Sequence, residues 1–290
     1  MEATRHIAAL LLISLSAATL PAETMKLKTR TQVLTASSKG RHTPMEREVQ
    51  WDTKKTAIII CDMWDKHWCP NSEARVGEMA GPMNTLIEQA RKRGVFIIHA
   101  PSSVVDFYKD TPQRKRAQSA PFAKTPIALS TAQRWGTAWC WPDPQREPTL
   151  PIDDSDMGCD CKEKYEPGAV WKRQIKTLRI DPADAITDNA QETWNLLHAR
   201  GIDNVILMGV HLNMCVLGRP FGIRQMVKLG KNVVLVRDFT DCMYNPRMRP
   251  YVSHFAGNRL MVEYVEKYWC PTITSTTLTG KPEFRFKSDK

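Results

Sequence analysis

The chain has 290 residues, of which 42% are hydrophobic and 25% are charged. These values are ordinary for a globular protein, so they exclude a disordered chain and a coiled coil, and the length allows one large domain with a sizeable core. The net charge is +10, but the basic residues are scattered, and the only dense run is Arg114, Lys115 and Arg116. A solvated face explains such a pattern better than a nucleic-acid site does.

The first 22 residues have the pattern of a secretory signal peptide. Arg5 and His6 precede an apolar run from Ile7 to Leu15, and small residues follow as far as Ala22. This run is shorter than the roughly 20 residues that a membrane span requires, and no later stretch qualifies. We therefore expect cleavage after Ala22 and export to the periplasm or the extracellular space, with residues 23–290 forming a single domain without a membrane span.

Eight cysteines in an exported chain suggest disulfide bonds. The candidates lie in a polar segment or precede a proline: Cys69, Cys140, Cys159, Cys161 and Cys270. Their connectivity does not follow from the sequence. The C-x-C pair could instead bind zinc, but no second pair at zinc-finger spacing accompanies it. The candidates for free thiols lie in or beside apolar runs, and they are Cys61, Cys215 and Cys242.

The predicted elements alternate along most of the chain. Residues 26–51 predict an early strand or hairpin. Short apolar runs then predict strands at 56–62, 95–100, 204–210 and 232–238, with a last short strand within 271–278. Segments of helical periodicity predict helices at 82–94, 189–201, 217–230 and 254–269.

This alternation predicts an α/β fold of three layers, with a mainly parallel, Rossmann-like sheet covered by helices on both faces. Continuous apolar strands agree, because strands buried on both faces lose the alternation of polar and apolar residues. Residues 101–167 are rich in Pro, Asp and Trp and show little periodicity. We therefore expect a long insertion over one rim of the sheet.

Open parallel sheets bind ligands beyond the carboxyl ends of their strands. Asp62, His99, Cys215 and Asp238 lie at those positions. A cysteine attacks a carbonyl carbon as the thiolate, so it needs a base or a positive neighbour and benefits from the start of a helix. The predicted helix after Cys215 would supply that start, and Asp62 could accept the thiol proton.

Two stretches resemble the isochorismatase-like cysteine hydrolases, which include nicotinamidases and N-carbamoylsarcosine amidase. IIICDMWD ends a strand with an acid, and GVHLNMCV places a cysteine after a second strand, followed by KLGKNVVLVRDFTD. The resemblance covers roughly residues 54 to 275. It implies a three-layer α/β/α hydrolase of the amidase type, without a cofactor, that uses an Asp, a Lys and a Cys.

Within that resemblance, Asp62 matches the catalytic aspartate and Cys215 the nucleophile. The backbone N–H groups of Met214 and Cys215 would line the oxyanion hole, in a turn that the family often builds with a cis peptide. The family's lysine ends the strand that precedes the helix leading to the nucleophile, and here two alternatives are open. If AVWKRQIK is that strand, Lys172 or Lys176 could serve, and Lys172 is preferred.

If DAIT is that strand instead, Asp188 occupies the place of the lysine, and the cation is missing or comes from Arg173. The candidates for substrate binding flank the two motifs, and they are Trp64, His67, His99, His211 and Asn213. Some nicotinamidases hold a metal through Asp-x-His, and Asp65, His67 and His99 could converge on one. Polar residues lining a pocket are the better interpretation, so no metal site is assigned here.

The function that the sequence predicts is an exported cysteine hydrolase that cleaves a small amide or a related C–N bond. Its partners would be a small-molecule substrate and a second copy of the chain in a homo-oligomer, and no nucleic acid. The alternative is a noncatalytic binding or structural protein on the same fold with an incomplete triad. Thiol redox chemistry ranks lower because the sequence has no C-x-x-C motif.

Overall fold

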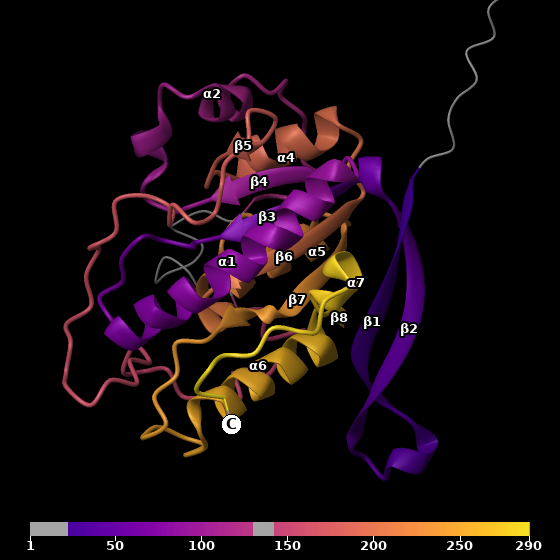
Figure 1. Ribbon diagram of the computed structural model, residues 1–290. Helices are drawn as coiled ribbons and strands as arrows, with labels where there is room; N and C mark the ends of the chain where they lie inside the picture. Colours follow the sequence, from indigo (N-terminus) through magenta and orange to yellow (C-terminus); the bar gives the residue numbers. More distant parts are fainter. Residues whose placement is uncertain (1–22, 130–141, 290) are drawn as a thin grey trace, which may run out of the picture.

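A computed structural model describes residues 23–129 and 142–289. The predicted signal peptide and Cys140 lie outside the described residues. Eight strands form one sheet in the order β2-β1-β8-β7-β6-β3-β4-β5 (Figure 1). Within the described ranges, no helix combines the length and the apolar character that crossing a bilayer would require.

Six strands run parallel to one another and form the body of the sheet. They are β3 (Thr56–Cys61), β4 (Phe96–Ala100), β5 (Ala185–Ile186), β6 (Asn204–Val210), β7 (Asn232–Asp241) and β8 (Thr272–Ile273). Their side chains are almost entirely buried, which is why their sequences read as continuous apolar runs. The prediction of a mainly parallel sheet is confirmed.

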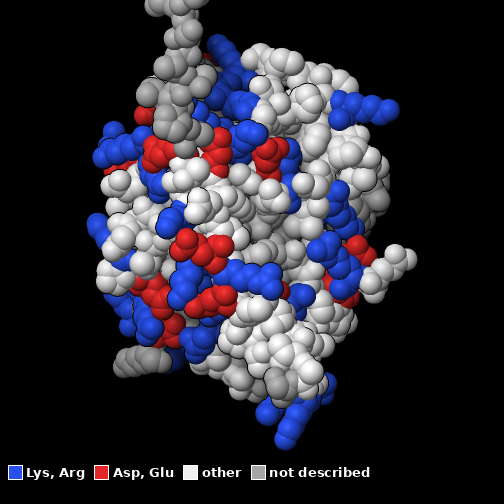
Figure 2. Space-filling view, turned by 90° about the vertical axis from the view of Figure 1, so that its right-hand side faces the viewer, with Lys and Arg blue, Asp and Glu red and all other residues white. Residues whose placement is uncertain are grey.

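An antiparallel hairpin extends the sheet beyond β8, as predicted for residues 26–51. It consists of β1 (Thr24–Leu34) and β2 (His42–Asp52), with the short helical turn η1 (Ala36–Ser38) between them. Charged pairs such as Lys28 and Glu46, 2.6 Å apart, cover its exposed surface. Figure 2 views the molecule from the side of this hairpin and shows basic and acidic side chains intermixed over that face.

Helices cover both faces of the sheet. α1 (Pro70–Lys92) and α7 (Thr276–Thr279) pack on one face, and α2 (Pro112–Gln118), α4 (Ala190–Ala199), α5 (Ile223–Lys228) and α6 (His254–Tyr268) pack on the other. Strand β3 packs against the helices on both faces of the sheet. Ile58 and Ile60 face α1. The alternate residues, Ala57, Ile59 and Cys61, face the opposite helices. The three-layer α/β/α prediction is confirmed.

Two helix boundaries differ from the predictions. α1 begins twelve residues before the predicted 82, because Pro70 lies at its first turn and the interior Pro82 does not end it. The helix expected at 217–230 is shorter and covers only α5. Pro220 and Gly222 disfavour a continuous helix there, and a short π-helical turn, η4 (Leu212–Val216), precedes it.

The segment between β4 and β5 is long, and the insertion predicted at 101–167 falls within it. It includes the turn η3 (Val105–Tyr108) and α2, and the short turn η2 (Thr53–Lys55) lies earlier, before β3. Glu147 anchors this insertion to α5 and α6, because its carboxylate forms a 2.7 Å ion pair with Arg224 and accepts a hydrogen bond from the Tyr264 hydroxyl at 2.8 Å. All three side chains are buried or nearly so.

Candidate active site

Asp62 and Cys215 meet at the carboxyl edge of the sheet. Asp62 directly follows β3, Cys215 lies five residues after β6, and these two strands are parallel neighbours in the middle of the sheet. The two side chains interact, and both are buried, Asp62 completely and Cys215 to all but 4% of its surface. Cys215 is a free thiol.

Backbone geometry fixes the carboxylate at this edge. Asp62 has a positive φ of 47°, its N–H donates to the carbonyl of Ala100 at 3.1 Å, and its Oδ1 accepts the N–H of Ser102 at 2.7 Å. Gly209 in β6 has a φ of 114°, and a Cβ at this position would overlap the carbonyl oxygen of Cys61. Only glycine therefore lets β6 approach the end of β3 so closely.

Arg219 adds a positive charge beside Asp62 and Cys215, and these three residues form one cluster. Its Nε lies 3.7 Å from Oδ2 of Asp62, and the arginine side chain is 17% exposed. The N–H of Arg219 donates to the carbonyl of Cys215 at 2.9 Å, so the two residues are one helical turn apart and share a face. Arg219 was not predicted as a site residue, although its spacing of four residues from Cys215 was the available signal.

The three groups perturb one another's pKa values. Burial raises the pKa of Asp62, and the charge of Arg219 opposes that rise. Burial also raises the pKa of the Cys215 thiol, the negative charge of Asp62 adds to the rise, and Arg219 again opposes it. Burial alone would lower the pKa of Arg219, but Cys215 and Asp62 raise it overall. An acid, a thiol and a permanent cation therefore share one desolvated site, where a proton can pass from sulfur to carboxylate.

The turn that carries Cys215 is irregular. The peptide bond between Val210 and His211 is cis, and Cys215 lies inside the π-helical turn η4. The N–H of Met214 donates to the carbonyl of His211 at 3.0 Å, and the N–H of Val216 donates to the same oxygen at 3.1 Å. The oxyanion hole at Met214 and Cys215 stays a prediction.

The choice of Lys172 depended on AVWKRQIK being a strand of the sheet, and that prediction is wrong. The strand beside β4 is β5, from the DAIT stretch, and AVWKRQIK does not join the sheet. One residue of AVWKRQIK, Gln174, instead forms an isolated antiparallel bridge with Trp64. Lys172 is exposed, and its backbone N–H donates to Asp65 at 3.0 Å.

The other candidate cations and the competing acid are exposed or engaged away from Asp62. Lys176 is exposed. Arg173 lies 3.4 Å from the carboxylate of Asp65, and Asp188 accepts the N–H of Ser103 at 2.9 Å. Within the described ranges, the basic side chain recorded within 4 Å of the Asp62 carboxylate is that of Arg219.

An aromatic wall stands next to the cluster, formed by Trp64, His67, Trp171 and His211. The rings of Trp64 and Trp171 stack with centroids 4.1 Å apart, and the rings of His67 and His211 lie 5.0 Å apart. Trp64 is tied to the Asp62 loop, because its indole N–H donates to the carbonyl of Ser102 at 3.2 Å. The structure thus brings three predicted pocket residues together and adds Trp171, which lies far away in sequence.

Both histidines of the wall are held neutral. Burial lowers the pKa of His67 to about 4, and its Nδ1 accepts the N–H of Cys69 at 3.0 Å. Burial also lowers the pKa of His211 well below its usual value, and its Nε2 lies 2.6 Å from the hydroxyl of Ser72. The wall is therefore uncharged, and Trp64, His67 and His211 are buried, whereas Trp171 is half-buried.

Asn213 and His99 are engaged elsewhere. The Asn213 amide donates to the carbonyl of Met243 at 3.0 Å and to Asp154 of the insertion at 2.7 Å. His99 lies between Gln174, 2.9 Å away, and Asp184, 3.0 Å away. These bonds connect segments of the fold. Together with the separate partners of Asp65 and His67, they also mean that the Asp65, His67 and His99 side chains do not converge.

The cysteine predictions have a mixed outcome. Cys61, Cys215 and Cys242 are free thiols, as predicted. No disulfide joins the remaining cysteines of the described segments, Cys69, Cys159, Cys161 and Cys270. The pairing expected among them is not seen.

Comparisons with known proteins find similarity only at the level of structure. No family model and no curated protein matches the chain. A cysteine hydrolase from Pseudomonas syringae is 17% identical with a TM-score of 0.48, over 79% of this chain and 93% of that one. N-carbamoylsarcosine amidase from Thermoplasma acidophilum is 11% identical with a TM-score of 0.40, over 76% and 96% of the two chains.

A third solved structure, pyrazinamidase of Pyrococcus horikoshii in complex with zinc, is 13% identical with a TM-score of 0.40, over 76% of this chain and 99% of that one. Similarity this distant assigns no activity and no residue role to the chain. The chain is thus remotely similar in structure to a cysteine hydrolase, an amidase and a pyrazinamidase.

Proposed function

We propose that the protein is an exported cysteine hydrolase that cleaves a small amide or a related C–N bond. Cys215 is the nucleophile, Asp62 the base, and Arg219 the cation in place of the expected Lys172. The observation that carries the proposal is the buried contact of a thiol, a carboxylate and a guanidinium at the carboxyl edge of a parallel sheet.

The proposed reaction has two halves. In the first, the Cys215 proton moves to Asp62, the thiolate attacks the carbonyl carbon, and the C–N bond breaks as Asp62 returns the proton to the departing nitrogen. Ammonia or an amine leaves, and a thioester to Cys215 remains. In the second, Asp62 takes a proton from water, the resulting hydroxide displaces sulfur, and a carboxylic acid and the thiol are released.

Arg219 makes the first proton transfer possible. Burial disfavours both the thiolate and the carboxylate, so a low-dielectric site without a cation would keep the proton on sulfur. The guanidinium carries a permanent charge and lies against both groups, which offsets the cost of having one anion between them.

One observation favours the noncatalytic alternative. The raised pKa of Cys215 means that the resting thiol is protonated at neutral pH, as in an inert buried cysteine. The two functions differ in where the thiol proton of Cys215 lies once a ligand is bound. An enzyme transfers the thiol proton to Asp62 when a substrate binds, whereas a binding protein keeps it on sulfur.

Ammonia release from a panel of small primary amides, including nicotinamide, tests the proposal. We expect turnover of at least one amide by the mature chain, and a loss of at least about a thousandfold in Cys215→Ala and Asp62→Asn. Cys242→Ala is the matched control, because Cys242 is also a free and fully buried thiol. Binding of an amide without hydrolysis, unchanged by these substitutions, would support the binding protein instead.

A further inference from the structure

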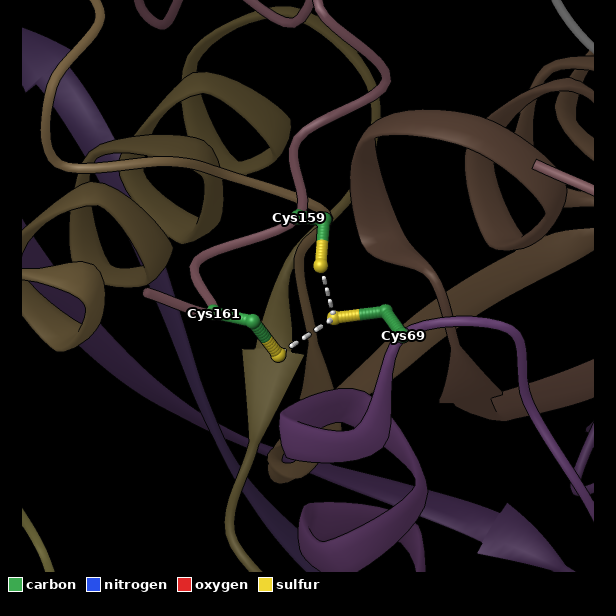
Figure 3. A group of neighbouring side chains, drawn as sticks. All are labelled: Cys69, Cys159 and Cys161. Carbon is green, nitrogen blue, oxygen red and sulfur yellow. Dashed lines mark hydrogen bonds between the residues drawn. The ribbon is translucent and has the colours of Figure 1, made fainter. Parts of the chain in front are cut away.

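Three cysteine sulfurs converge at a place that the catalytic proposal does not use. The Sγ of Cys69 lies 2.7 Å from that of Cys159 and 3.8 Å from that of Cys161, and all three lie within 4.8 Å of one another (Figure 3). Cys69 precedes α1, whereas the other two belong to the insertion about ninety residues later. The sequence showed only the C-x-C pair, so its third partner could not be recognised.

The loop that carries the C-x-C pair is held in place by its own contacts. Gly158 has a φ of 71°, and a Cβ there would overlap the backbone of Met243. Asp156 accepts a hydrogen bond from the Asn245 amide at 2.7 Å. Asp160, between the two cysteines, forms a 2.8 Å ion pair with Arg75 of α1. The two thiols are therefore presented to Cys69 by a positioned loop.

The three sulfurs are largely shielded from solvent, and one of them lies at the start of a helix. Cys69 is the N-cap residue of the 23-residue helix α1, where the helix dipole favours negative charge. Its N–H donates to His67 at 3.0 Å, which fixes its backbone. Cys69 is fully buried, Cys161 is 6% exposed, and Cys159 is half-buried, so the sulfurs face one another more than they face water. Burial raises the pKa of the Cys69 and Cys159 thiols.

We propose that Cys69, Cys159 and Cys161 form a binding site for a thiophilic divalent metal ion of the Zn²⁺ class. Zn–S bonds of about 2.3 Å in a tetrahedral site place two sulfurs about 3.8 Å apart. The distance between Cys69 and Cys161 already has this value. Cys159 must move away from Cys69 by about 1 Å, and it is the most exposed of the three.

On binding, three thiols release their protons to solvent and three metal–sulfur bonds form, without any change of oxidation state. Solvent would take the fourth position, because both oxygens of the nearby Asp160 carboxylate accept hydrogen bonds from Arg75. The number of sulfurs favours this site over a disulfide. A disulfide between Cys69 and Cys159 would use two of them and leave the third as a thiol beside it, whereas a metal ion uses all three.

The metal would serve to hold the insertion. It would connect the insertion to the start of α1, two residues after His67 of the aromatic wall. Its role is therefore structural, and it does not depend on whether Cys215 is catalytic.

Metal binding by the full mature chain tests this site. The protein is reduced, freed of reductant under anaerobic conditions and titrated with Co²⁺, followed by elemental analysis after exchange for Zn²⁺. We expect one metal ion per chain and thiolate-to-cobalt charge-transfer absorption. Cys69→Ala, Cys159→Ala and Cys161→Ala should each weaken binding at least about tenfold. Cys270→Ala is the matched control, because Cys270 is buried elsewhere and should leave binding unchanged.

Alkylation of the parent protein decides the question without any variant. With Zn²⁺ bound, peptide mapping should find Cys69, Cys159 and Cys161 protected from alkylation, and chelation should expose them. Binding of less than about 0.2 metal ions per chain by the reduced protein would overturn the proposal. So would three variants that bind like the parent, or a Cys69–Cys159 disulfide in protein kept with zinc.

Discussion

Replacing Arg219 by Met removes the cation of the cluster while keeping a side chain of similar length. Unit charges 3.7 Å apart interact by at most about 4.5 kcal/mol at an effective dielectric constant of about 20. Because Arg219 is mostly buried, solvent weakens this interaction only in part. A loss of about 3–4 kcal/mol from the ionic state corresponds to a 10²–10³-fold decrease in kcat/KM. Arg219→Lys keeps the positive charge but lacks the planar guanidinium group, so its kcat/KM should fall by less.

Two measurements follow the substitution: amide hydrolysis, and the pH dependence of Cys215 alkylation by iodoacetamide. The onset of alkylation should move to higher pH in Arg219→Met, because Arg219 is the group that opposes the rise in the pKa of Cys215. Arg173→Met is the control, since Arg173 pairs with Asp65 instead. An Arg219→Met protein that is folded and keeps both the parent activity within threefold and the parent alkylation profile refutes the reasoning.

Three further predictions concern other parts of the molecule. Lys172→Met should leave kcat/KM unchanged within about twofold, because the side chain is exposed, and a large loss would restore it to the triad. Gly209→Ala should destabilise the protein by about 2–5 kcal/mol in urea unfolding, through strain and overlap with Cys61, whereas Gly77→Ala in open space on α1 should not destabilise it. Burial lowers the pKa of His254, but its contact with Asp241 at 2.8 Å raises it overall. Its charged form therefore stabilises the fold fully below the unfolded pKa of about 6.5, and this contribution is lost as the pH rises through the raised value. The difference in unfolding free energy between the parent and His254→Gln should shrink from pH 6 to pH 9; a constant difference contradicts this assignment.

The parallel sheet and the meeting of Asp62 with Cys215 could be predicted from sequence because both depend on local patterns. Buried strands read as apolar runs, and the residue after each parallel strand must lie at the same edge. β6 was predicted with its observed bounds, Asn204–Val210. The pairing of β3 with β6 then places the two residues side by side.

The role of Arg219 and the cluster of Cys69, Cys159 and Cys161 could not be predicted, because they depend on irregular segments of the chain. β5 has only two residues, too few for a periodic signal, so the competing AVWKRQIK stretch looked more like a strand. Arg219 follows a π-helical turn that the apolar pattern did not reveal. Cys69 meets the C-x-C pair only through the path of the insertion, which hydrogen bonds from Asn213 and Asn245 determine.

Mass spectrometry of the protein during turnover tests the central claim most directly. The mature chain is mixed with an activated small acyl amide, quenched with acid and digested, and the acyl group is located by peptide mapping. We expect a thioester on Cys215 that is absent in Cys215→Ala and still formed in Cys61→Ala, where the neighbouring buried thiol is removed. No acyl adduct despite amide consumption, or an adduct on another cysteine, contradicts the account.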